Sequence, residues 1–222
     1  MAAQLLTGLR NRLIVSAQAY PGEPMRTPDT MSRVAQAAVI GGAAAIRCQG
    51  LADVELISAT VKVPVIGLWK DGHDGVFITP TLDHALAVAD AGADIVAIDG
   101  TRRERGDGLS LVETIAGLHQ RDALVMADCG SLDDGLAAAD AGADVVGTTL
   151  AGYTDDRTKT DGPDLELIAE LAGRIRVPVV AEGRVHTPAQ ARAALDAGAF
   201  AVAVGTAITH PTTLTSWFVE AL

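Results

Sequence analysis

Cysteine and long apolar runs are scarce in this sequence, and each scarcity excludes a class of protein. The cysteines, Cys48 and Cys129, are too few for a disulfide framework, and we interpret them as reduced thiols that fill small spaces. No run of about 18 strongly apolar residues occurs, and residues 1–15 contain Arg10 and Arg12 but no small-residue cleavage motif. We therefore expect no signal peptide, no contact with a membrane and a cytoplasmic location.

Positive charge is also in short supply. The chain has 17 Lys and Arg residues against 28 Asp and Glu residues, which gives a formal net charge of −11. A nucleic-acid-binding protein is expected to present a basic face, so we expect no nucleic-acid partner. An anionic small molecule is still a suitable substrate, because a cluster of backbone N–H groups and one Arg can hold a phosphate inside an acidic protein.

Small residues are abundant where aromatic residues are few. Hydrophobic residues make up 49% of the chain, aromatic residues only 3%, and there are 23 glycines. Small side chains allow helices to pack closely on strands. A length of 222 residues suits a compact (β/α)8 barrel, a fold of roughly 200 to 400 residues, so we expect one domain over residues 1–222.

A fourfold repeat organises the chain. Each copy is an Ala-rich amphipathic helix, a Gly-Ala pair and a short β-branched run, and the pairs begin at Gly42, Gly92, Gly142 and Gly198. Glycine after a helix supplies the left-handed conformation of a C-terminal cap, and the short apolar run is typical of a buried parallel strand. The spacings of 50, 50 and 56 residues are too long for one βα unit and suit two.

Four further strand-like segments lie between the repeats. The predicted strands are therefore 13–18, 43–48, 64–70, 94–99, 123–129, 144–149, 177–182 and 200–205. Strands that alternate with helices form a parallel sheet with right-handed crossovers, and eight such units close into a (β/α)8 TIM barrel. The rival is a doubly wound open sheet, which usually carries a Gly-rich first turn. The segment SAQAYPGEP after the first strand has no such turn.

Polar residues stand at the ends of these apolar strands. In order they are Gln18, Arg47, Lys70, Asp99, Asp128, Thr148 with Thr149, Glu182 and Gly205. The active site of a (β/α)8 barrel lies at the C-terminal ends of its strands, and burying an unpaired charge is costly. The set therefore predicts the mouth of a pocket, although any single member could instead bond only to a nearby loop.

Lys70 is the most informative of these residues. It ends the apolar segment VPVIGLWK, so it should point into the mouth of the barrel. A lysine has an ordinary pKa near 10.4, which burial and a nearby cation such as Arg47 would lower. Such a lysine can act as a general base or form a Schiff base. A structural salt bridge with Asp128 or Glu182 is the alternative.

The loops after the seventh and eighth strands predict a phosphate site. They contain Gly183 with Arg184, and Gly205 with Thr206 at the start of a short helix. These two loops bind phosphate in many barrels, because glycines allow the backbone to approach and a helix N-terminus favours an anion. The five histidines are scattered without metal-ligand spacing, so we expect no metal.

Several linked motifs resemble a known family. SAQAYPGEPM (16–25), IGLWKDGHDGVFITPT (66–81), MADCGSLDDGLAAADAGADVVGTTLAGYT (126–154) and VVAEGRVHTPAQARAALDAGAFAVAVGTAIT (179–209) are similar to the N-acetylmannosamine-6-phosphate 2-epimerases, also called N-acylglucosamine-6-phosphate 2-epimerases. The resemblance implies a (β/α)8 barrel isomerase of sialic acid catabolism. It would interconvert N-acetylmannosamine 6-phosphate and N-acetylglucosamine 6-phosphate without an organic cofactor. A homodimer is an expected assembly.

The resemblance also assigns roles to residues. It implies that Lys70 is the catalytic lysine and Glu182 its partner carboxylate, that Gln18, Arg47 and Asp128 contact substrate, and that the backbone around Gly183, Arg184, Gly205 and Thr206 grips phosphate. Two segments depart from the family. Asp71-Gly72-His73 follows the lysine where the family commonly has a basic residue and then Asp-Tyr, and His210 stands where Arg commonly precedes Pro.

The implied chemistry is inversion at C2, a carbon next to a carbonyl. Lys70 is the candidate for proton removal and return, and Glu182 is a second acid/base or a group that relays protons. Arg47 and Gln18 would stabilise oxyanion charge. A Schiff-base aldolase that uses Lys70 and a non-catalytic sugar-phosphate-binding barrel are the alternatives. A sugar-phosphate decarboxylase would need an Asp-x-Lys-x-x-Asp motif, which Leu68-Trp69-Lys70 breaks.

Overall fold

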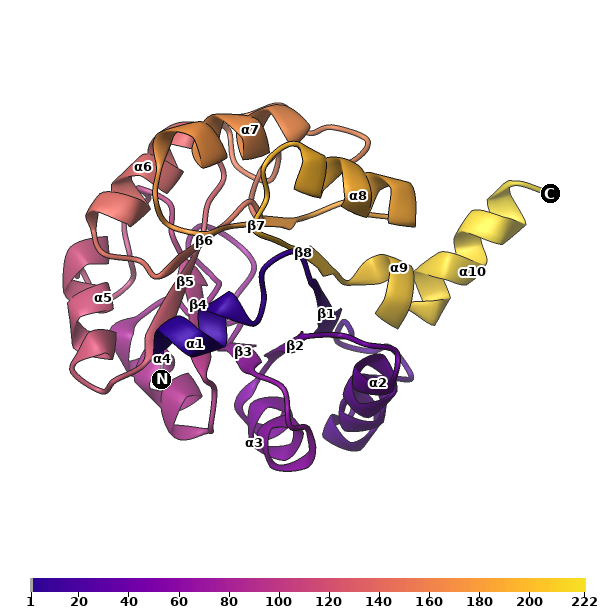
Figure 1. Ribbon diagram of the computed structural model, residues 1–222. Helices are drawn as coiled ribbons and strands as arrows, with labels where there is room; N and C mark the ends of the chain where they lie inside the picture. The colour runs from indigo at the N-terminus through magenta and orange to yellow at the C-terminus, as the bar shows by residue number, and fades with distance from the viewer. Residues whose placement is uncertain (1) are drawn as a thin grey trace.

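The strands of this chain close into one parallel barrel. The computed structural model describes residues 2–222, and each strand pairs with its neighbours in chain order until β8 returns to β1 (Figure 1). The strands are β1 Leu13–Ala17, β2 Ala45–Gln49, β3 Val65–Leu68, β4 Ile95–Asp99, β5 Leu124–Asp128, β6 Val145–Gly147, β7 Val179–Glu182 and β8 Ala201–Val204. The predicted barrel is confirmed, the strand bounds agree to within two residues, and the open-sheet alternative is wrong.

Helices alternate with the strands and surround them (Figure 1). They are α1 Ala2–Thr7, α2 Pro28–Ile40, α3 Leu51–Thr60, α4 Leu82–Asp90, α5 Leu111–His119, α6 Leu132–Asp140, α7 Leu165–Arg174, α8 Pro188–Asp196, α9 Thr206–Thr209 and α10 Pro211–Glu220. The helices of the four repeats begin after Thr27, Thr81, Ser131 and Thr187, whose hydroxyls accept a backbone N–H of the first turn.

The glycines of the repeat end these helices as predicted. Gly42, Gly92, Gly142 and Gly198 have φ angles of 101°, 102°, 98° and 108°. A side chain is strained in this left-handed region, so glycine lets the chain turn from a helix into the next strand within a few residues. The repeat is thus one helix, a glycine turn and one strand.

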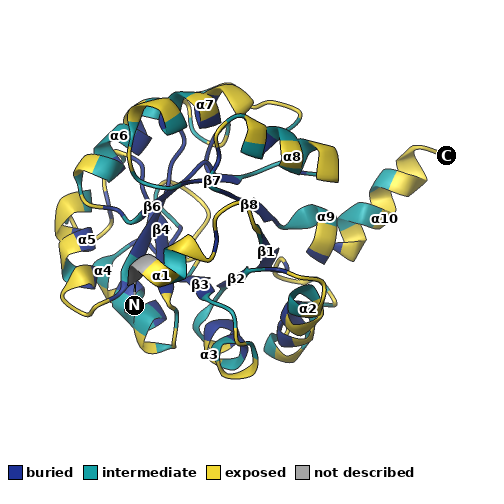
Figure 2. Ribbon diagram, viewed as in Figure 1, coloured by how far each residue is buried: buried dark blue, intermediate teal, exposed yellow. Residues whose placement is uncertain are grey.

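Side chains of each strand alternate between the barrel interior and the helices. On β4, Ile95 and Ala97 join an interior cluster with Ile66 and Met126, whereas Val96 packs on the helix side. The strands are accordingly buried on both faces (Figure 2). The same alternation points every second residue inward, and this set includes the polar residues at the strand ends.

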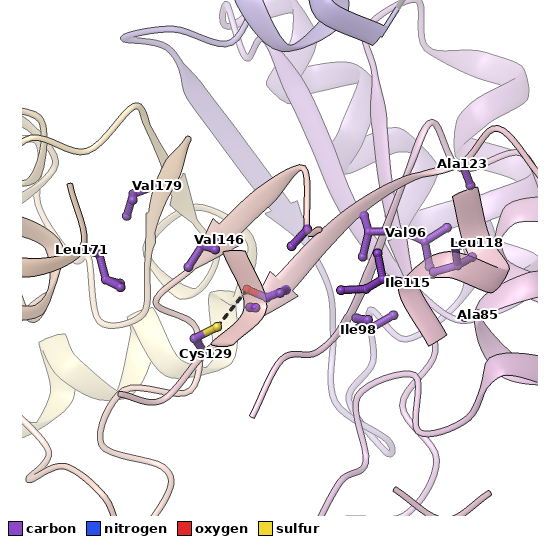
Figure 3. Close-up of a cluster of buried hydrophobic side chains, with 14 of the residues drawn as sticks. Ala85, Val96, Ile98, Ile115, Leu118, Ala123, Cys129, Val146, Leu171 and Val179 are labelled. Carbon is purple, nitrogen blue, oxygen red and sulfur yellow. Dashed lines mark hydrogen bonds between the residues drawn. The ribbon is translucent and has the colours of Figure 1, made fainter. Parts of the chain in front are cut away.

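A large apolar cluster fills the space between strands β4 to β7 and helices α4 to α7. Figure 3 shows Val96 and Ile98 beside Ile115 and Leu118 of α5. Cys129 lies in the same cluster, and its thiol donates to the Ala127 carbonyl at 3.5 Å. Both cysteines are free and buried, so their interpretation as small core residues is confirmed.

The two ends of the chain behave differently. Leu5 and Leu6 of α1, together with Leu9, pack on the interior cluster at the N-terminal ends of the strands. α10 instead leads away from the ring of helices (Figures 1 and 2). None of its residues Pro211–Glu220 is buried, and Phe218 is 75% exposed. Between residues 2 and 222 no helix has both the length and the apolar character needed to cross a membrane.

Gly67 on β3 tests the close packing of helices on the barrel. A Cβ atom there would lie 2.8 Å from Val88 Cγ1 and 2.8 Å from Ala93 Cβ. We expect Gly67→Ala to lower the free energy of unfolding by about 1–3 kcal/mol because the core cannot accept the added methyl group without strain. Urea denaturation measures this. Gly173→Ala on the exposed face of α7 is the matched control, since nothing lies within 4 Å. An equal effect in both variants would contradict the packing argument.

Candidate active site

One large cavity opens at the C-terminal ends of the strands. Its volume is about 1010 Å³, and it is lined by eight of the nine predicted site residues, namely Gln18, Arg47, Lys70, Glu182, Gly183, Arg184, Gly205 and Thr206. Asp128 is the ninth and lies buried behind this lining. A smaller cavity of about 340 Å³, next to Lys62 and Pro64, lies at the opposite end of the barrel, away from all of these residues. The sequence therefore located the main cavity correctly.

Arg47 ties three strands together inside the barrel. Its Nη1 and Nη2 donate to Asp128 Oδ1 and Oδ2 at 3.1 and 2.6 Å, and its Nε lies 3.2 Å from Glu182 Oε1. The Arg47 side chain is only 1% exposed. Desolvation alone would lower its pKa, but the charges of Asp128 and Glu182 outweigh it and raise the pKa. The guanidinium is thus fixed in place and stays charged.

Glu182 is partly free. Its backbone is held by Thr148, whose Oγ1 donates to the Glu182 carbonyl at 2.9 Å and accepts the Glu182 N–H at 3.1 Å. Of its carboxylate, Oε1 faces Arg47, whereas Oε2 has no hydrogen-bond partner among the described residues. Burial raises the pKa of Glu182, and the positive charge of Arg47 opposes that shift. Oε2 is therefore a buried acceptor without a partner in the described chain, on a residue that lines the cavity.

Lys70 lies two residues beyond the end of β3, in a loop that folds back on itself. It forms an antiparallel bridge with Ile78, and its Nζ donates to Gln18 Oε1 at 2.9 Å. Gln18 Nε2 in turn donates to Ser16 Oγ at 2.8 Å. Desolvation inside the mouth and the charge of Arg47 lower the pKa of Lys70, while its side chain stays accessible from the cavity. A neutral amine, which is a base, is thus easier to form here than on an ordinary lysine.

The predicted phosphate loops present free backbone amides. Among the residues that the structure describes, the N–H groups of Gly183, Arg184, Gly205 and Thr206 donate to no other group of the chain. Gly183 has a φ of 108° and Arg184 a φ of 56°, a turn that directs consecutive amides to one side. These amides belong to residues that line the cavity, so they can bind an anion.

The Arg184 side chain, unlike its backbone amide, is hydrogen-bonded to a neighbouring loop. Its Nη1 donates to the Ala151 carbonyl at 2.7 Å, its Nη2 to Thr160 Oγ1 at 3.0 Å and its Nε to the Gly162 carbonyl at 3.1 Å. The guanidinium therefore holds the long loop between β6 and α7 against the phosphate loop. Its charge remains beside the amides.

The cavity also contains residues that strand ends alone did not reveal. Tyr20 and Arg26 come from the loop after β1, and His210 follows α9. The His210 side chain is only 5% exposed. Its Nδ1 lies 3.8 Å from Glu23 Oε2 but forms no hydrogen bond in the described chain. The Tyr20 ring lies 4.9 Å from the His210 ring. Burial lowers the pKa of His210, Glu23 opposes this shift and Lys70 adds to it.

Asp99 departs from the predicted set of mouth residues. It is fully buried and accepts hydrogen bonds from Thr101 and, at 2.7 Å, from Arg103 Nη2. Its own N–H donates to the Ile78 carbonyl, so the loop after β3 covers the end of β4. Asp99 is therefore a structural residue. Within residues 2–222, His, Cys, Asp and Glu side chains form no group of three that could hold a metal ion.

Loss of Arg47 should destabilise the fold in a pH-dependent way. Arg47→Met leaves two carboxylates buried without a cation, which costs about 3–5 kcal/mol of unfolding free energy. Burial already raises the folded-state pKa of Glu182, and loss of the Arg47 charge that opposes this shift raises it further, so the stability deficit should be greatest above that raised pKa and should shrink as the pH falls through it. Urea denaturation at about pH 5 and about pH 8 measures this. Arg192→Met, in an exposed pair with Asp196, is the control, and a deficit independent of pH would contradict the argument.

Comparison with known proteins places the chain in a family. The family model described as "Putative N-acetylmannosamine-6-phosphate epimerase" matches residues 31–222. A protein of Cutibacterium acnes named "Putative N-acetylmannosamine-6-phosphate 2-epimerase" is 60% identical over 222 residues, which cover 99% of this chain and 97% of that protein. A protein of the same name from Caldanaerobacter subterraneus is 45% identical and covers 99% of this chain, and the match spans 94% of its own length.

Solved structures agree with this placement. The N-acetylmannosamine-6-phosphate 2-epimerase from Clostridium perfringens superposes with a TM-score of 0.95 at 38% identity, over 98% of this chain and 96% of that one. Thiamine phosphate pyrophosphorylase from Pyrococcus furiosus, with a TM-score of 0.65 and 20% identity over 96% and 93% of the two chains, shares the barrel fold alone. The family resemblance seen in the motifs is thus confirmed, and the chain belongs to the N-acetylmannosamine-6-phosphate epimerase family.

Proposed function

We propose that this enzyme interconverts N-acetylmannosamine 6-phosphate and N-acetylglucosamine 6-phosphate by removing and returning the proton on C2. The observation that carries the proposal is Lys70, an amine of lowered pKa that opens onto the cavity beside the Arg47 ion pairs. Family membership supports the choice of sugars. The role that follows is a step in amino sugar and sialic acid catabolism, without an organic cofactor and in the cytoplasm, where the free buried thiols Cys48 and Cys129 would stay reduced.

Lys70 is the base in this proposal. Its neutral amine takes the C2 proton of the open-chain sugar, the electron pair of the broken C2–H bond forms a C1–C2 double bond, and the carbonyl π pair moves onto the oxygen. The enolate then turns its other face toward the same group, now an ammonium, which returns a proton to that face of C2 as the carbonyl re-forms. A base whose pKa lies closer to the working pH than that of an ordinary lysine suits both directions of transfer.

Fixed charges stabilise the enolate oxygen. The N–H at Arg47 Nε forms no hydrogen bond in the described chain, and Gln18 lies between Lys70 and Ser16. A donor that is already oriented gains more from the developing charge than one that must reorganise. Asp128 keeps the guanidinium in place from behind, and Glu182, which lines the cavity with its Oε2 buried and unpaired, would accept a hydrogen bond from the sugar once a small shift of its side chain exposes that oxygen. Glu182 therefore positions the reacting end of the substrate.

The phosphate anchors the other end of the substrate. We assign it to the backbone amides of Gly183, Arg184, Gly205 and Thr206, which have no partner in the described chain and belong to residues that line the cavity. Amides at a glycine turn and at a helix start favour an anion. Binding energy from this remote group would then hold C2 against Lys70.

Replacement of Lys70 tests the function directly. We expect wild-type protein in D₂O to convert each of the two 6-phosphates into the other, with deuterium entering C2, as read by proton NMR. Lys70→Ala should abolish both exchange and conversion while it still binds either sugar phosphate, because the phosphate amides are untouched. Turnover near the wild-type rate in this variant would refute the assignment. Covalent trapping of Lys70 by borohydride in the presence of substrate would instead favour a Schiff-base aldolase.

His210 tests the position of the phosphate. In its neutral form it can donate one hydrogen bond but brings no charge. We expect His210→Arg to lower the KM for the 6-phosphates by about tenfold near neutral pH, which corresponds to about 1.4 kcal/mol. His210→Gln, which is neutral, should stay near the wild type. The KM for unphosphorylated N-acetylmannosamine is the control, and an equal decrease for that sugar would show that His210 does not face the phosphate.

A further inference from the structure

Thr79 has an unusual backbone conformation. Its φ is 48°, in the left-handed region that a β-branched residue rarely adopts. Across residues 2–222 the other non-glycine residues with positive φ are Asn11, Asp122 and Arg184, and Asn and Asp tolerate this region well. A strained residue persists only where its surroundings hold it, and such residues gather at functional sites. Thr79 is fully buried, so the hydrogen bonds around it should show what holds it.

Every polar atom of Thr79 is engaged. Its N–H donates to the Trp69 carbonyl at 2.7 Å, and its Oγ1 accepts the Trp69 N–H at 3.1 Å. The same hydroxyl donates to the Ala97 carbonyl of β4 at 2.6 Å, and the Thr79 carbonyl accepts a bond from Arg105 Nη2 at 2.9 Å. Thr79 therefore links the loop after β3 to β4 through its hydroxyl and to the loop after β4 through its carbonyl.

Arg105 is a buried cation that the proposed reaction does not use. It is 5% exposed, and its two Nη atoms donate to the carbonyls of Asp99 and Thr79 at 2.8 and 2.9 Å. Its Nε has no partner among the described residues. Burying a guanidinium costs desolvation energy, which its two charge-assisted hydrogen bonds to these carbonyls offset, and the contact holds the two carbonyls together. The bond from Arg105 therefore fixes the position of Thr79.

The loop that Thr79 closes is the one that carries Lys70. β3 ends at Leu68, and Lys70 lies in the antiparallel hairpin beyond it, bridged to Ile78. The Asp71 N–H donates to the Phe77 carbonyl in the same hairpin. The parallel ladder of the barrel therefore does not reach Lys70. Trp69 is the residue just before Lys70, so the contacts of Thr79 with Trp69 fix where the hairpin starts.

We propose that Thr79, clamped by Arg105, is a positioning residue for Lys70. The inference rests on the proposed role of Lys70 as the base. Without the Thr79 hydroxyl, the Trp69 N–H and the Ala97 carbonyl lose their partner, and the hairpin is free to relax away from β4. Lys70 would then move out of the mouth and away from Gln18, although the phosphate amides on the far loops would be unchanged. The reaction rate should fall while substrate binding stays intact.

The test compares Thr79→Val with Thr79→Ser. Valine keeps the shape and removes the hydroxyl, whereas serine keeps the hydroxyl. We expect Thr79→Val to lower kcat by about 10- to 100-fold, the loss that a displacement of about 1 Å can cause, with KM changed by less than about threefold. Thr79→Ser should restore kcat to within about threefold of the wild type. Thr212→Val on the exposed face of α10 is the matched control.

A second readout reports the Lys70 environment without relying on turnover. Trace acetylation of each lysine across pH, quantified by mass spectrometry, gives the pH at which its amine becomes reactive, and Lys62 and Lys159 serve as internal standards. In Thr79→Val the midpoint for Lys70 should move to higher pH, toward that of an ordinary lysine, because the amine becomes better solvated and lies farther from Arg47. Thr79→Ser should keep the wild-type midpoint.

The two readouts separate the possible failures. If Thr79→Val folds and keeps both the wild-type kcat and the wild-type Lys70 midpoint, the positioning role is wrong. If the midpoint moves but Lys70→Ala is fully active, the positioning role holds and the proposed base is wrong. If Thr79→Val does not fold, Arg105→Gln replaces it. The positioning role then requires the same upward shift of the Lys70 midpoint and the same fall in kcat, and their absence overturns it.

Discussion

The pairing of Arg47 with Asp128 and Glu182 is the interaction on which the rest of the site depends. The three residues come from β2, β5 and β7, and they meet inside the barrel, where the guanidinium is 1% exposed and Asp128 is fully buried. Charges at such a depth are tolerated only in compensated form. One cation therefore fixes two carboxylates, and, after desolvation, its charge is the next cause of the lowered pKa of Lys70. Arg47 thus contributes both to the stability of the barrel interior and to the lowered pKa of Lys70.

The barrel makes this arrangement possible through small residues and regular alternation. Glycine turns such as Gly92 and Gly142 return the chain from helix to strand with a fixed phase, and the period of two along a strand then points Arg47, Asp128 and Glu182 inward. Apolar residues such as Ile66 and Met126 fill the lower layers of the interior. The polar layer is the uppermost one, and the loops above it supply the phosphate amides.

Periodicity is local, and for that reason much of the fold could be predicted. The repeat around Gly42, Gly92, Gly142 and Gly198 was sufficient to predict the closed barrel. The residues at the strand ends were sufficient to predict the position of the cavity, which Arg47, Lys70 and Glu182 line together. The positions of Asp99 and Lys70 could not be foreseen in detail. Both depend on how the loop after β3 folds over β4, and that depends on the contact of Arg105 with Thr79, which lies 26 residues away in the sequence.

Side-chain direction in loops was equally out of reach. Nothing in the order of residues shows that the Arg184 guanidinium binds carbonyls of the preceding loop while its amide makes no hydrogen bond in the described chain. The burial of His210 beside Tyr20 and Glu23 likewise depends on two loops that meet only in the folded chain. The chemical roles assigned to site residues, the single-domain organisation over 1–222 and the homodimer stay predictions.

In the proposed mechanism Lys70 makes both proton transfers at C2, while Glu182, held by Arg47, positions the substrate. The direct measurement uses Glu182→Gln, a near-isosteric change, in D₂O, with deuterium at C2 of recovered substrate compared with product formed from each epimer. If Lys70 does both transfers, exchange and inversion should fall together by the same factor from both directions. Exchange that continues from one epimer while inversion stops would contradict the claim and would make Glu182 the acid on the opposite face.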